Sequence, residues 1–292
     1  MLHAGGAVFA AILRDDPTDV ITPYGYGGPV GADARFWDRY EAWCRARGVV
    51  STFIRFHPLY RNHLAVGPNV AVESLGGTVA WRLDEPGDLF GRMHRHHRRA
   101  VRKADAAGVE TSVTVAPESL ARFVRLYEAT MERRGARGFY YFPPAYWARF
   151  ERDGDVCVPI HRRMGTHAQV VLFEAGEHAA LLCLASPPWL HYHLGASSEE
   201  GRKAGASNLL FLEAARWAQQ NGYTRFHLGG GVGGALDSLY EFKLRFDPGG
   251  ELAAAVGKIV HDHGAYRRLA GRRAGPDGFF PAYRAPAGTV RT

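Results

Sequence analysis

One short segment near the C-terminal end, residues 237–246, combines a single lysine with aromatic and aliphatic residues. Leu239, Phe242 and Phe246 recur at i, i+3 and i+7, which predicts a helix with one buried apolar stripe. Lys243 lies on the adjoining face, where a lysine beside an apolar surface is suited to stabilise a developing oxyanion. The alternative is a surface lysine that packs its aliphatic stem and extends its ammonium group into water.

Two further segments have the composition of phosphate-binding loops. The glycine run 229–234 lacks the Lys-Ser/Thr pair of a P-loop, so a flexible turn is the simpler interpretation. Residues 202–207, Arg-Lys-Ala-Gly-Ala-Ser, resemble the Arg-x-x-Gly-x-Gly/Ala loop with which GNAT acetyltransferases hold the pyrophosphate of acetyl-CoA. Ser207 departs from that pattern, because its side chain would crowd the close backbone approach that a pyrophosphate needs.

Histidine and cysteine give no indication of a metal site. The histidines of residues 94–97 are embedded in cations, and the pairs 191/193 and 261/263 lack a third ligand nearby. The three cysteines, Cys44, Cys157 and Cys183, are far apart and form no CxxC motif, so we expect buried thiols in a reducing compartment.

The net charge of +7 is concentrated in two segments. Residues 92–103 carry +6 and residues 258–292 carry +5, which leaves the rest of the chain slightly acidic. Such clustering favours a polyanionic partner; a solvated helix face and a loose tail are the alternative.

Helical and strand-like patterns alternate along the 292 residues, which predicts a mixed α/β fold. In the first half we expect strands at 6–14, 49–56, 69–74 and 78–83 and one helix at 33–47. In the second half we expect helices from Asp88 through the basic segment to 108, from Pro117 to Gly135, at 203–221 and at 237–246, and strands at 156–163, 167–174, 178–186, 190–194 and 225–228.

Composition is that of a globular protein, with 46% hydrophobic and 22% charged residues. No stretch approaches the roughly 18 uncharged apolar residues that span a bilayer. The N-terminal apolar segment has no preceding basic residue, so a first strand is expected there rather than a signal peptide, and a cytoplasmic location follows.

Three segments together resemble the Fem family of aminoacyl-tRNA-dependent transferases (FemABX-like). They are residues 191–198, His-Tyr-His-Leu-Gly-Ala-Ser-Ser; residues 225–230, Arg-Phe-His-Leu-Gly-Gly; and residues 239–246, Leu-Tyr-Glu-Phe-Lys-Leu-Arg-Phe. Residues 24–29 and 53–59 resemble segments of related bacterial proteins. The resemblance implies a tandem GNAT-like fold, with a degenerate N-terminal half at 1–86, a catalytic domain at 87–250 and a basic extension at 251–292.

The resemblance also implies roles for individual residues. Lys243 matches the lysine that stabilises the oxyanion, Phe242 its neighbour at the end of the acceptor stem, and Tyr192 a tyrosine near the tRNA end. On chemistry alone, the aromatic loops add Arg55, Arg137, Tyr140 and Tyr24 as substrate-binding candidates. The basic segment 92–103 adds Arg98, Arg99 and Arg102 as ligands of the tRNA backbone, and Arg202 is a further substrate- or tRNA-binding candidate.

The resemblance implies transfer of an amino acid from aminoacyl-tRNA to the free amine of a peptide-like acceptor, either a peptide antibiotic or a peptidoglycan precursor. An aminoacyl ester is already activated, so no cofactor or metal is expected. The compact length resembles family members of natural-product pathways such as pacidamycin assembly. Two alternatives are an acetyl- or acyl-CoA-dependent N-acyltransferase and a nucleic-acid-binding module without catalysis.

Overall fold

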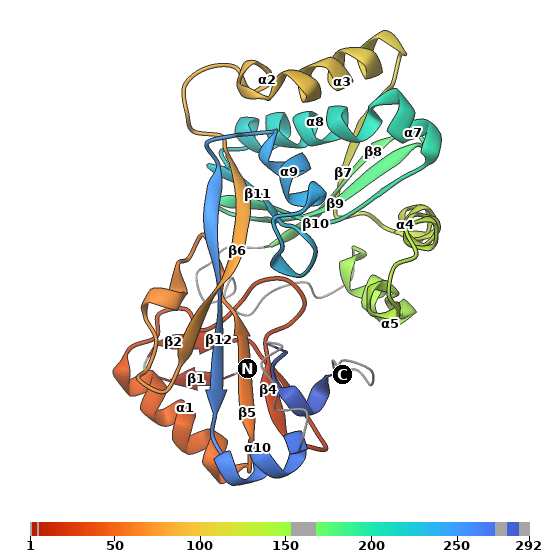
Figure 1. The fold of residues 1–292 in the computed structure, drawn as a ribbon. Coiled ribbons are helices and arrows are strands. Elements are labelled where there is room, and N and C mark those ends of the chain that lie inside the picture. Colours follow the sequence, from red (N-terminus) through yellow and green to blue (C-terminus); the bar gives the residue numbers. More distant parts are fainter. Residues whose placement is uncertain (1, 5, 153–167, 272–278, 286–292) are drawn as a thin grey trace. The chain divides into compact units, whose positions relative to one another are not determined.

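The chain forms two units that interleave along the sequence (Figure 1). The computed structural model describes residues 2–4, 6–152, 168–271 and 279–285. One unit combines Met1–Gly76 with Ala253–Thr292, and the other is Gly77–Leu252. The chain passes between them within two long strands, β6 (Ala71–Arg82) and β12 (Glu251–Val260). The predicted division into domains at 1–86, 87–250 and 251–292 stays a prediction.

Four strands of the first unit pair in the order β3-β4-β5-β12, with β4 and β5 parallel and the other neighbours antiparallel. A separate antiparallel pair joins β1 and β2. Besides parts of β6 and β12, the elements are β1 (Leu2–Ala4), β2 (Ala7–Phe9), β3 (Ile12–Arg14), β4 (Asp19–Ile21), α1 (Ala34–Ala46), β5 (Ser51–Arg55), η1 (Asn62–Leu64), α10 (His263–Ala270) and η6 (Ala282–Arg284).

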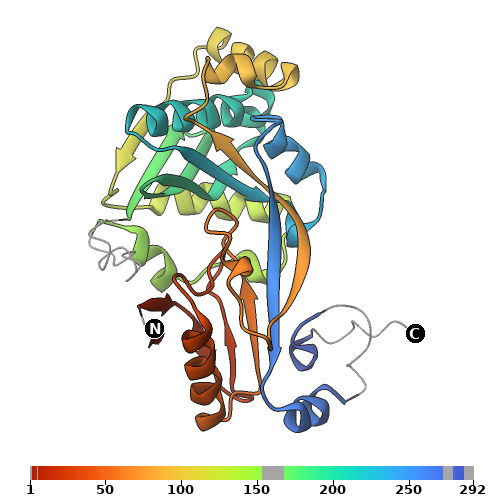
Figure 2. The same cartoon turned by 90° about the vertical axis from the view of Figure 1, so that its left-hand side faces the viewer.

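Helix α1, seen in Figure 2, confirms the helix predicted at 33–47. Its buried residues belong to the core of this unit. Asp33 caps it by accepting a 2.8 Å hydrogen bond from the backbone N–H of Phe36. The face of α1 that contains Phe36, Trp37 and Tyr40 is buried against strand residues that include Phe9 and Ile54. Helical spacing of these aromatic residues was therefore a sound guide to the buried face.

Two sequence predictions for strands need correction. The strand expected at 6–14 is interrupted, and its residues belong to β2 and β3. The strands expected at 69–74 and 78–83 are one continuous strand, β6, because the Gly76-Gly77 pair continues the strand instead of turning the chain. At Gly77 a side chain is excluded, since an added Cβ would lie 2.9 Å from the Tyr240 hydroxyl.

The second unit contains six strands in the order β6-β11-β10-β9-β8-β7, and every neighbouring pair is antiparallel except β10 with β11. Its elements, besides parts of β6 and β12, are α2 (Leu89–Arg92), α3 (Arg95–Ala106), β7 (Ser112–Val115), α4 (Ala121–Arg133), η2 (Gly138–Tyr140), α5 (Pro144–Trp147), η3 (Ala148–Phe150), β8 (Gln169–Ala175), β9 (Ala179–Ser186), β10 (Trp189–Ser197), α7 (Glu199–Ala204), α8 (Ala206–Gln220), β11 (Arg225–Gly230), η4 (Val232–Gly234) and α9 (Ser238–Leu244).

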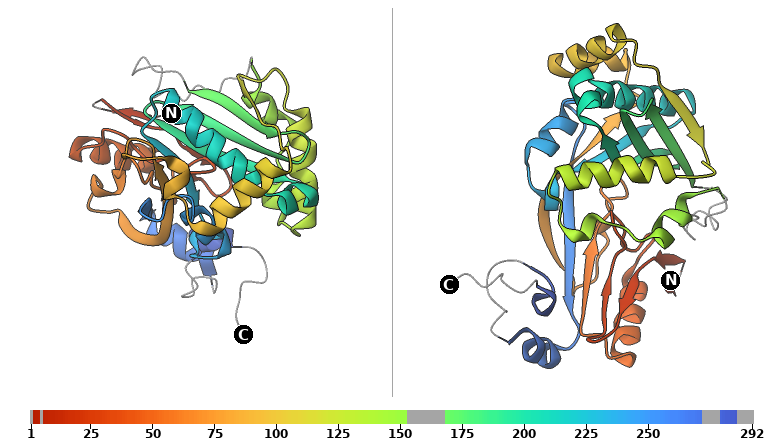
Figure 3. Two further views of the ribbon diagram at one scale, coloured as in Figure 1. Left: turned by 90° about the horizontal axis from the view of Figure 1, so that it is seen from above. Right: turned by 90° about the vertical axis from the view of Figure 1, so that its right-hand side faces the viewer.

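Helices cover both faces of this sheet (Figure 3). Helix α8 packs on one face, α3 lies against the outer side of α8, and α4 packs on the opposite face against β9 and β10. The helix expected from Asp88 to 108 is broken at Met93 into α2 and α3. The mixed α/β architecture predicted from the sequence is confirmed.

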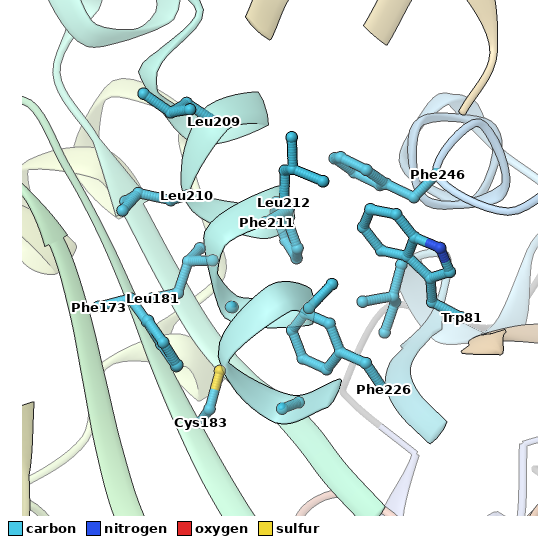
Figure 4. Packing of buried hydrophobic residues seen from close by; sticks show 14 of the residues in the cluster. Trp81, Phe173, Leu181, Cys183, Leu209, Leu210, Phe211, Leu212, Phe226 and Phe246 are labelled. Carbon is cyan, nitrogen blue, oxygen red and sulfur yellow. The ribbon is translucent and has the colours of Figure 1, made fainter. Parts of the chain in front are cut away.

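The core on the α8 face connects α9 to the sheet (Figure 4). Phe246, just after α9, packs its ring 5.3 Å from that of Trp81 and 4.8 Å from that of Phe211 on α8. All three residues are buried, and truncating such a ring to alanine costs about 3–5 kcal/mol. The C-terminal end of α9 is therefore held firmly in place.

The strand expected at 156–163 lies outside the described residues. Among those that are described, no helix combines the length and the apolar character needed to cross a membrane.

Candidate active site

Strands β10 and β11 run parallel and pair only at their beginnings. The pairing covers Trp189 to His191 and Arg225 to His227, although both strands continue beyond it. A bulge in β10 between Tyr192 and Leu194, and an irregularity in β11 after His227, accompany this separation. The later residues of β10 pair with β9 and those of β11 pair with β6, so the two strands diverge.

Lys243 connects the two diverging strands. Its Nζ donates a 2.6 Å hydrogen bond to the carbonyl of Gly230, at the end of β11. The same Nζ lies 5.4 Å from the ring centroid of Tyr192, on β10. The side chain is only 6% exposed, so the alternative of a surface lysine is wrong. Sequence spacing placed Lys243 beside the apolar stripe but did not show what covers it.

Burial also changes the acid–base behaviour of Lys243. Desolvation lowers the pKa of Lys243 to about 8, and the charge of Asp237 acts in the opposite direction. At neutral pH the ammonium form predominates. Since one N–H bonds to Gly230, up to two remain as donors for an oxygen that gains negative charge.

Tyr192 is held by two neighbours. Its ring packs 5.0 Å from that of Phe211 on α8. The space beside its hydroxyl is available only because residue 195 is glycine, since a Cβ there would lie 2.5 Å from the Tyr192 oxygen. The bulge and Gly195 together place the phenol ring beneath the Lys243 ammonium group.

Phe242 is half-buried and already packs against other rings. Its centroid lies 4.8 Å from that of His97 and 5.9 Å from that of Phe211. Helix α9 therefore carries Lys243 and Phe242 as neighbours, as predicted, but most of the Phe242 contacts that the structure describes are internal. Its contact with a tRNA end stays a prediction.

The basic helix α3 is attached to the C-terminal end of α9. His97 donates from Nε2 to the carbonyl of Phe242 at 2.7 Å, and the backbone N–H of His94 donates to the carbonyl of Arg245 at 2.8 Å. Carbonyls in the last turn of a helix have no partner within the helix, so α3 supplies partners for two of them. Sequence reasoning considered these histidines only as metal ligands and missed this role.

The predicted backbone ligands lie on α3 and α7 of the second unit. Arg99, Arg102 and Arg202 are exposed, and Arg98 is half-buried with a hydrogen bond to the carbonyl of Gly91. The guanidinium group of Arg102 also lies over the ring of Phe90 at 5.3 Å. A 2.7 Å hydrogen bond from Lys103 to the carbonyl of Lys203 joins the two helices. Two segments about 100 residues apart thus form one basic surface.

The segment expected to hold a pyrophosphate is helical. Residues 199–204 form α7, and only Gly205, with φ of +84°, separates α7 from α8. A Cβ on Gly205 would lie 2.5 Å from the carbonyl oxygen of Ala100, so the backbone of α3 lies directly against this position. Residues 202–207 therefore span the end of α7 and the start of α8, and the helix expected at 203–221 is two helices.

Four candidates lie elsewhere. Arg137 precedes η2 and is exposed, and the carbonyl of Tyr140 accepts a 3.0 Å hydrogen bond from Tyr127. Arg55, on β5, and Tyr24 belong to the other unit. Their segments meet there, because the backbone N–H of Arg55 donates to the hydroxyl of Thr22 at 3.0 Å. The roles of all four residues stay predictions.

Within the described residues, no three histidine, cysteine or acidic side chains gather as a metal site. Cys44 and Cys183 are buried free thiols, and Cys157 lies outside those residues. The glycine run is divided, since Gly229 and Gly230 belong to β11 and the rest forms a turn.

The sequence and fold were compared with known proteins. No curated protein matches the chain. The C-terminal domain of a putative lysylphosphatidylglycerol synthetase from Agrobacterium fabrum is similar in structure, with a TM-score of 0.57 and 16% identity over 92% of this chain and 85% of that one. L-PGS from Bacillus licheniformis has a TM-score of 0.58 and 14% identity, over 88% and 81%. FemX has a TM-score of 0.58 and 14% identity, over 87% and 85%.

At such identities these structures establish a shared mixed α/β, GNAT-like fold. The sequence itself matches the model of the acetyltransferase (GNAT) domain over residues 91–244, more than half of the chain. That segment contains α3, the diverging strands β10 and β11, and Lys243. The chain therefore belongs to the acetyltransferase (GNAT) domain family.

Proposed function

We propose that this chain is an aminoacyltransferase. It moves an amino acid from aminoacyl-tRNA, its co-substrate, to the free amine of a peptide-like acceptor such as a peptide antibiotic or a peptidoglycan precursor. The reaction needs no further cofactor. Charged tRNA is a cytoplasmic donor, so we place the reaction in the cytoplasm.

The observation that carries this proposal is the buried ammonium group of Lys243 between β10 and β11. The acceptor amine attacks the ester carbonyl carbon of the donor, and the carbonyl oxygen becomes an oxyanion. Lys243 donates an N–H to that oxygen. The attacking nitrogen loses a proton, the C–O bond to the terminal ribose breaks, the ribose oxygen takes up a proton, and the new C–N bond remains. Removing one donor of this kind costs about 10²–10³ in kcat.

The basic surface of α3 and α7 supports an RNA donor. Clustered arginines bind a phosphate backbone without reading its sequence. His94 and His97 connect α3 to α9, the helix that carries Lys243. RNA bound to α3 would therefore lie on a helix that contacts α9 directly. Among the structural neighbours, FemX bears the name of the family that the sequence resembles. The domain from Agrobacterium fabrum comes from a putative lysylphosphatidylglycerol synthetase.

Acyl-CoA-dependent N-acylation is the second candidate, because the family model is that of an acetyltransferase domain. Packing of Ala100 against Gly205 favours the first proposal, since α3 occupies the side of α8 where a pyrophosphate loop was expected. The same Lys243 would serve either donor.

The experiment supplies a pool of tRNA charged with radiolabelled amino acids to the protein together with candidate peptide amines. We expect labelling that is lost after RNase treatment and falls about 100-fold or more in Lys243→Ala. Lys243→Arg, which retains a cation, tests the importance of shape and pKa. A parallel reaction with labelled acetyl-CoA is the control. Labelling from acetyl-CoA alone would reject the tRNA donor, and full activity of Lys243→Ala would reject the role of Lys243.

A further inference from the structure

Asp237 bonds at once to the turn after β11 and to the first turn of α9. One carboxylate oxygen accepts a 2.9 Å hydrogen bond from the N–H of Tyr240, which caps the helix. The other oxygen accepts a 3.0 Å hydrogen bond from the N–H of Val232. An ordinary helix cap requires only the first of these bonds.

The turn held by Asp237 directly follows the acceptor of the Lys243 hydrogen bond. Gly230, whose carbonyl binds Nζ, is two residues before Val232. The intervening residue must be glycine, because a Cβ on Gly231 would lie 2.1 Å from the carbonyl oxygen of Ala235 and 2.3 Å from the Asp237 carboxylate. The carboxylate therefore lies tightly against the backbone that leads to Gly230, while it also fixes the start of the helix that carries Lys243.

The charge of Asp237 also acts on the lysine. Burial lowers the pKa of Lys243, and Asp237 is the charged group that opposes this effect. Although partial burial acts in the other direction, hydrogen bonds from Tyr240 and Val232 lower the pKa of Asp237, so its carboxylate is ionised at neutral pH. Tyr192 faces Lys243 from β10 with its ring. On α9 itself, Glu241 is exposed and pairs with Arg245.

We propose that Asp237 is a positioning residue of the site, which clamps the 231–232 turn against the first turn of α9 and so fixes the charged Nζ of Lys243 against Gly230. This proposal rests on the proposed function for its catalytic meaning. Whether Asp237 fixes the position of Lys243 and supports its charge can be measured without any substrate.

Asp237→Asn separates this role from simple capping. An asparagine oxygen still accepts from Tyr240, and asparagine is as good an N-cap as aspartate. Its NH₂ group cannot accept from Val232, and the negative charge is lost. Asp262→Asn is the matched control, since Asp262 caps α10 in the other unit by a 2.8 Å hydrogen bond from the N–H of Ala265.

The sequence offers a direct measurement, because only four of its 36 basic Lys and Arg residues are lysines: Lys103, Lys203, Lys243 and Lys258. Protein labelled with ¹³C at lysine Cε gives one NMR signal for each, and Lys243→Arg identifies the signal of Lys243. We expect a titration midpoint of about 8 for wild-type Lys243. In Asp237→Asn the midpoint should fall by about half a unit to one unit, and in Asp262→Asn it should not change.

The pH dependence of the transfer kinetics is the second measurement. In the wild-type protein, kcat/KM for transfer should decline above the Lys243 midpoint, and in Asp237→Asn this decline should move to lower pH by the same amount. An unchanged Lys243 midpoint in Asp237→Asn overturns the proposal, whatever happens to stability. If the wild-type protein transfers no amino acid from tRNA, the proposed function fails, while the NMR titration still decides whether Asp237 holds Lys243.

Discussion

His97 donates a 2.7 Å hydrogen bond from Nε2 to the main-chain carbonyl of Phe242, the residue that precedes Lys243. The imidazole is buried and packs 4.3 Å from the ring of Phe246 as well as against Phe242. Burial lowers the pKa of His97 to about 4, so the ring is neutral above that pH and donates without adding a charge. His97, although it lies in a basic segment, therefore helps to position α9, the helix that carries Lys243.

We expect His97→Asn to lower the free energy of unfolding by about 2 kcal/mol, because the shorter side chain leaves the Phe242 carbonyl without its partner and a space between two rings. Urea denaturation measures the change. His96→Asn is the control, since His96 is exposed on the same helix and should shift the value by less than about 0.5 kcal/mol. Equal effects of the two substitutions would contradict this account.

Gly205 gives a second test of how α3 packs. An alanine there must adopt φ of +84° and place its Cβ 2.5 Å from the Ala100 carbonyl oxygen. Gly222 has φ of +78° with no atom within 4 Å of the Cβ position, so it isolates the conformational cost. Gly222→Ala should cost about 1 kcal/mol, and Gly205→Ala at least about 1 kcal/mol more. Similar unfolding midpoints in urea for both variants would show that the backbone of α3 near Ala100 shifts at little cost to make room for the added Cβ.

Local patterns predicted the elements of the site better than its contacts. The aromatic spacing of residues 239–246 is local in the sequence, and it predicted α9 correctly. The partners of Lys243 come from β10 and β11, and no period within one helix could reveal a ring at Tyr192 or a carbonyl at Gly230. The burial of the lysine therefore stayed open until the tertiary structure was known.

Errors in the predicted elements have similar causes. Gly-Gly at 76–77 is a strong turn signal, but pairing with neighbouring strands keeps β6 extended. Residues 199–204 have a cap at Ser198 and two acidic residues, Glu199 and Glu200, in their first turn, all of which indicate a helix. The resemblance to a pyrophosphate loop was given more weight, so α7 was not predicted. No strand was predicted at 251–260, where the structure has β12.

The basic surface of α3 is testable without knowing the transferred amino acid. Arg99 and Arg102 are exposed, and replacing both with glutamate should weaken binding of a tRNA at least about 10-fold and reduce the salt dependence of log K by about 2. Arg122→Glu with Arg125→Glu on α4 makes the same change in net charge on exposed positions of another helix. Fluorescence anisotropy across a salt series measures both. If the α4 pair has the same effect, attraction follows net charge and α3 is not the binding surface.

Replacing Lys243 with methionine should stabilise the protein at neutral pH while it removes the proposed activity. The pKa of Lys243 is lowered from 10.5 to about 8 in the folded chain, so between these values the unfolded chain binds more protons. Wild-type stability should therefore rise with pH across this window, because the folded chain no longer buries an ammonium group. Below pH 8 the full penalty applies, and the shift corresponds to at most about 3 kcal/mol.

Methionine carries no charge, and its similar length preserves packing against Tyr192. We therefore expect Lys243→Met to unfold at higher urea concentration than wild type at pH 7, with the difference shrinking as the pH approaches 10.5. Lys258→Met, at a lysine that pairs with Glu73 in the other unit, is the control for replacing a lysine by methionine. A gain in stability that stays constant over this range would mean that the surroundings of Lys243 do not destabilise its ammonium group. The argument that this group is available to stabilise an oxyanion would then be rejected.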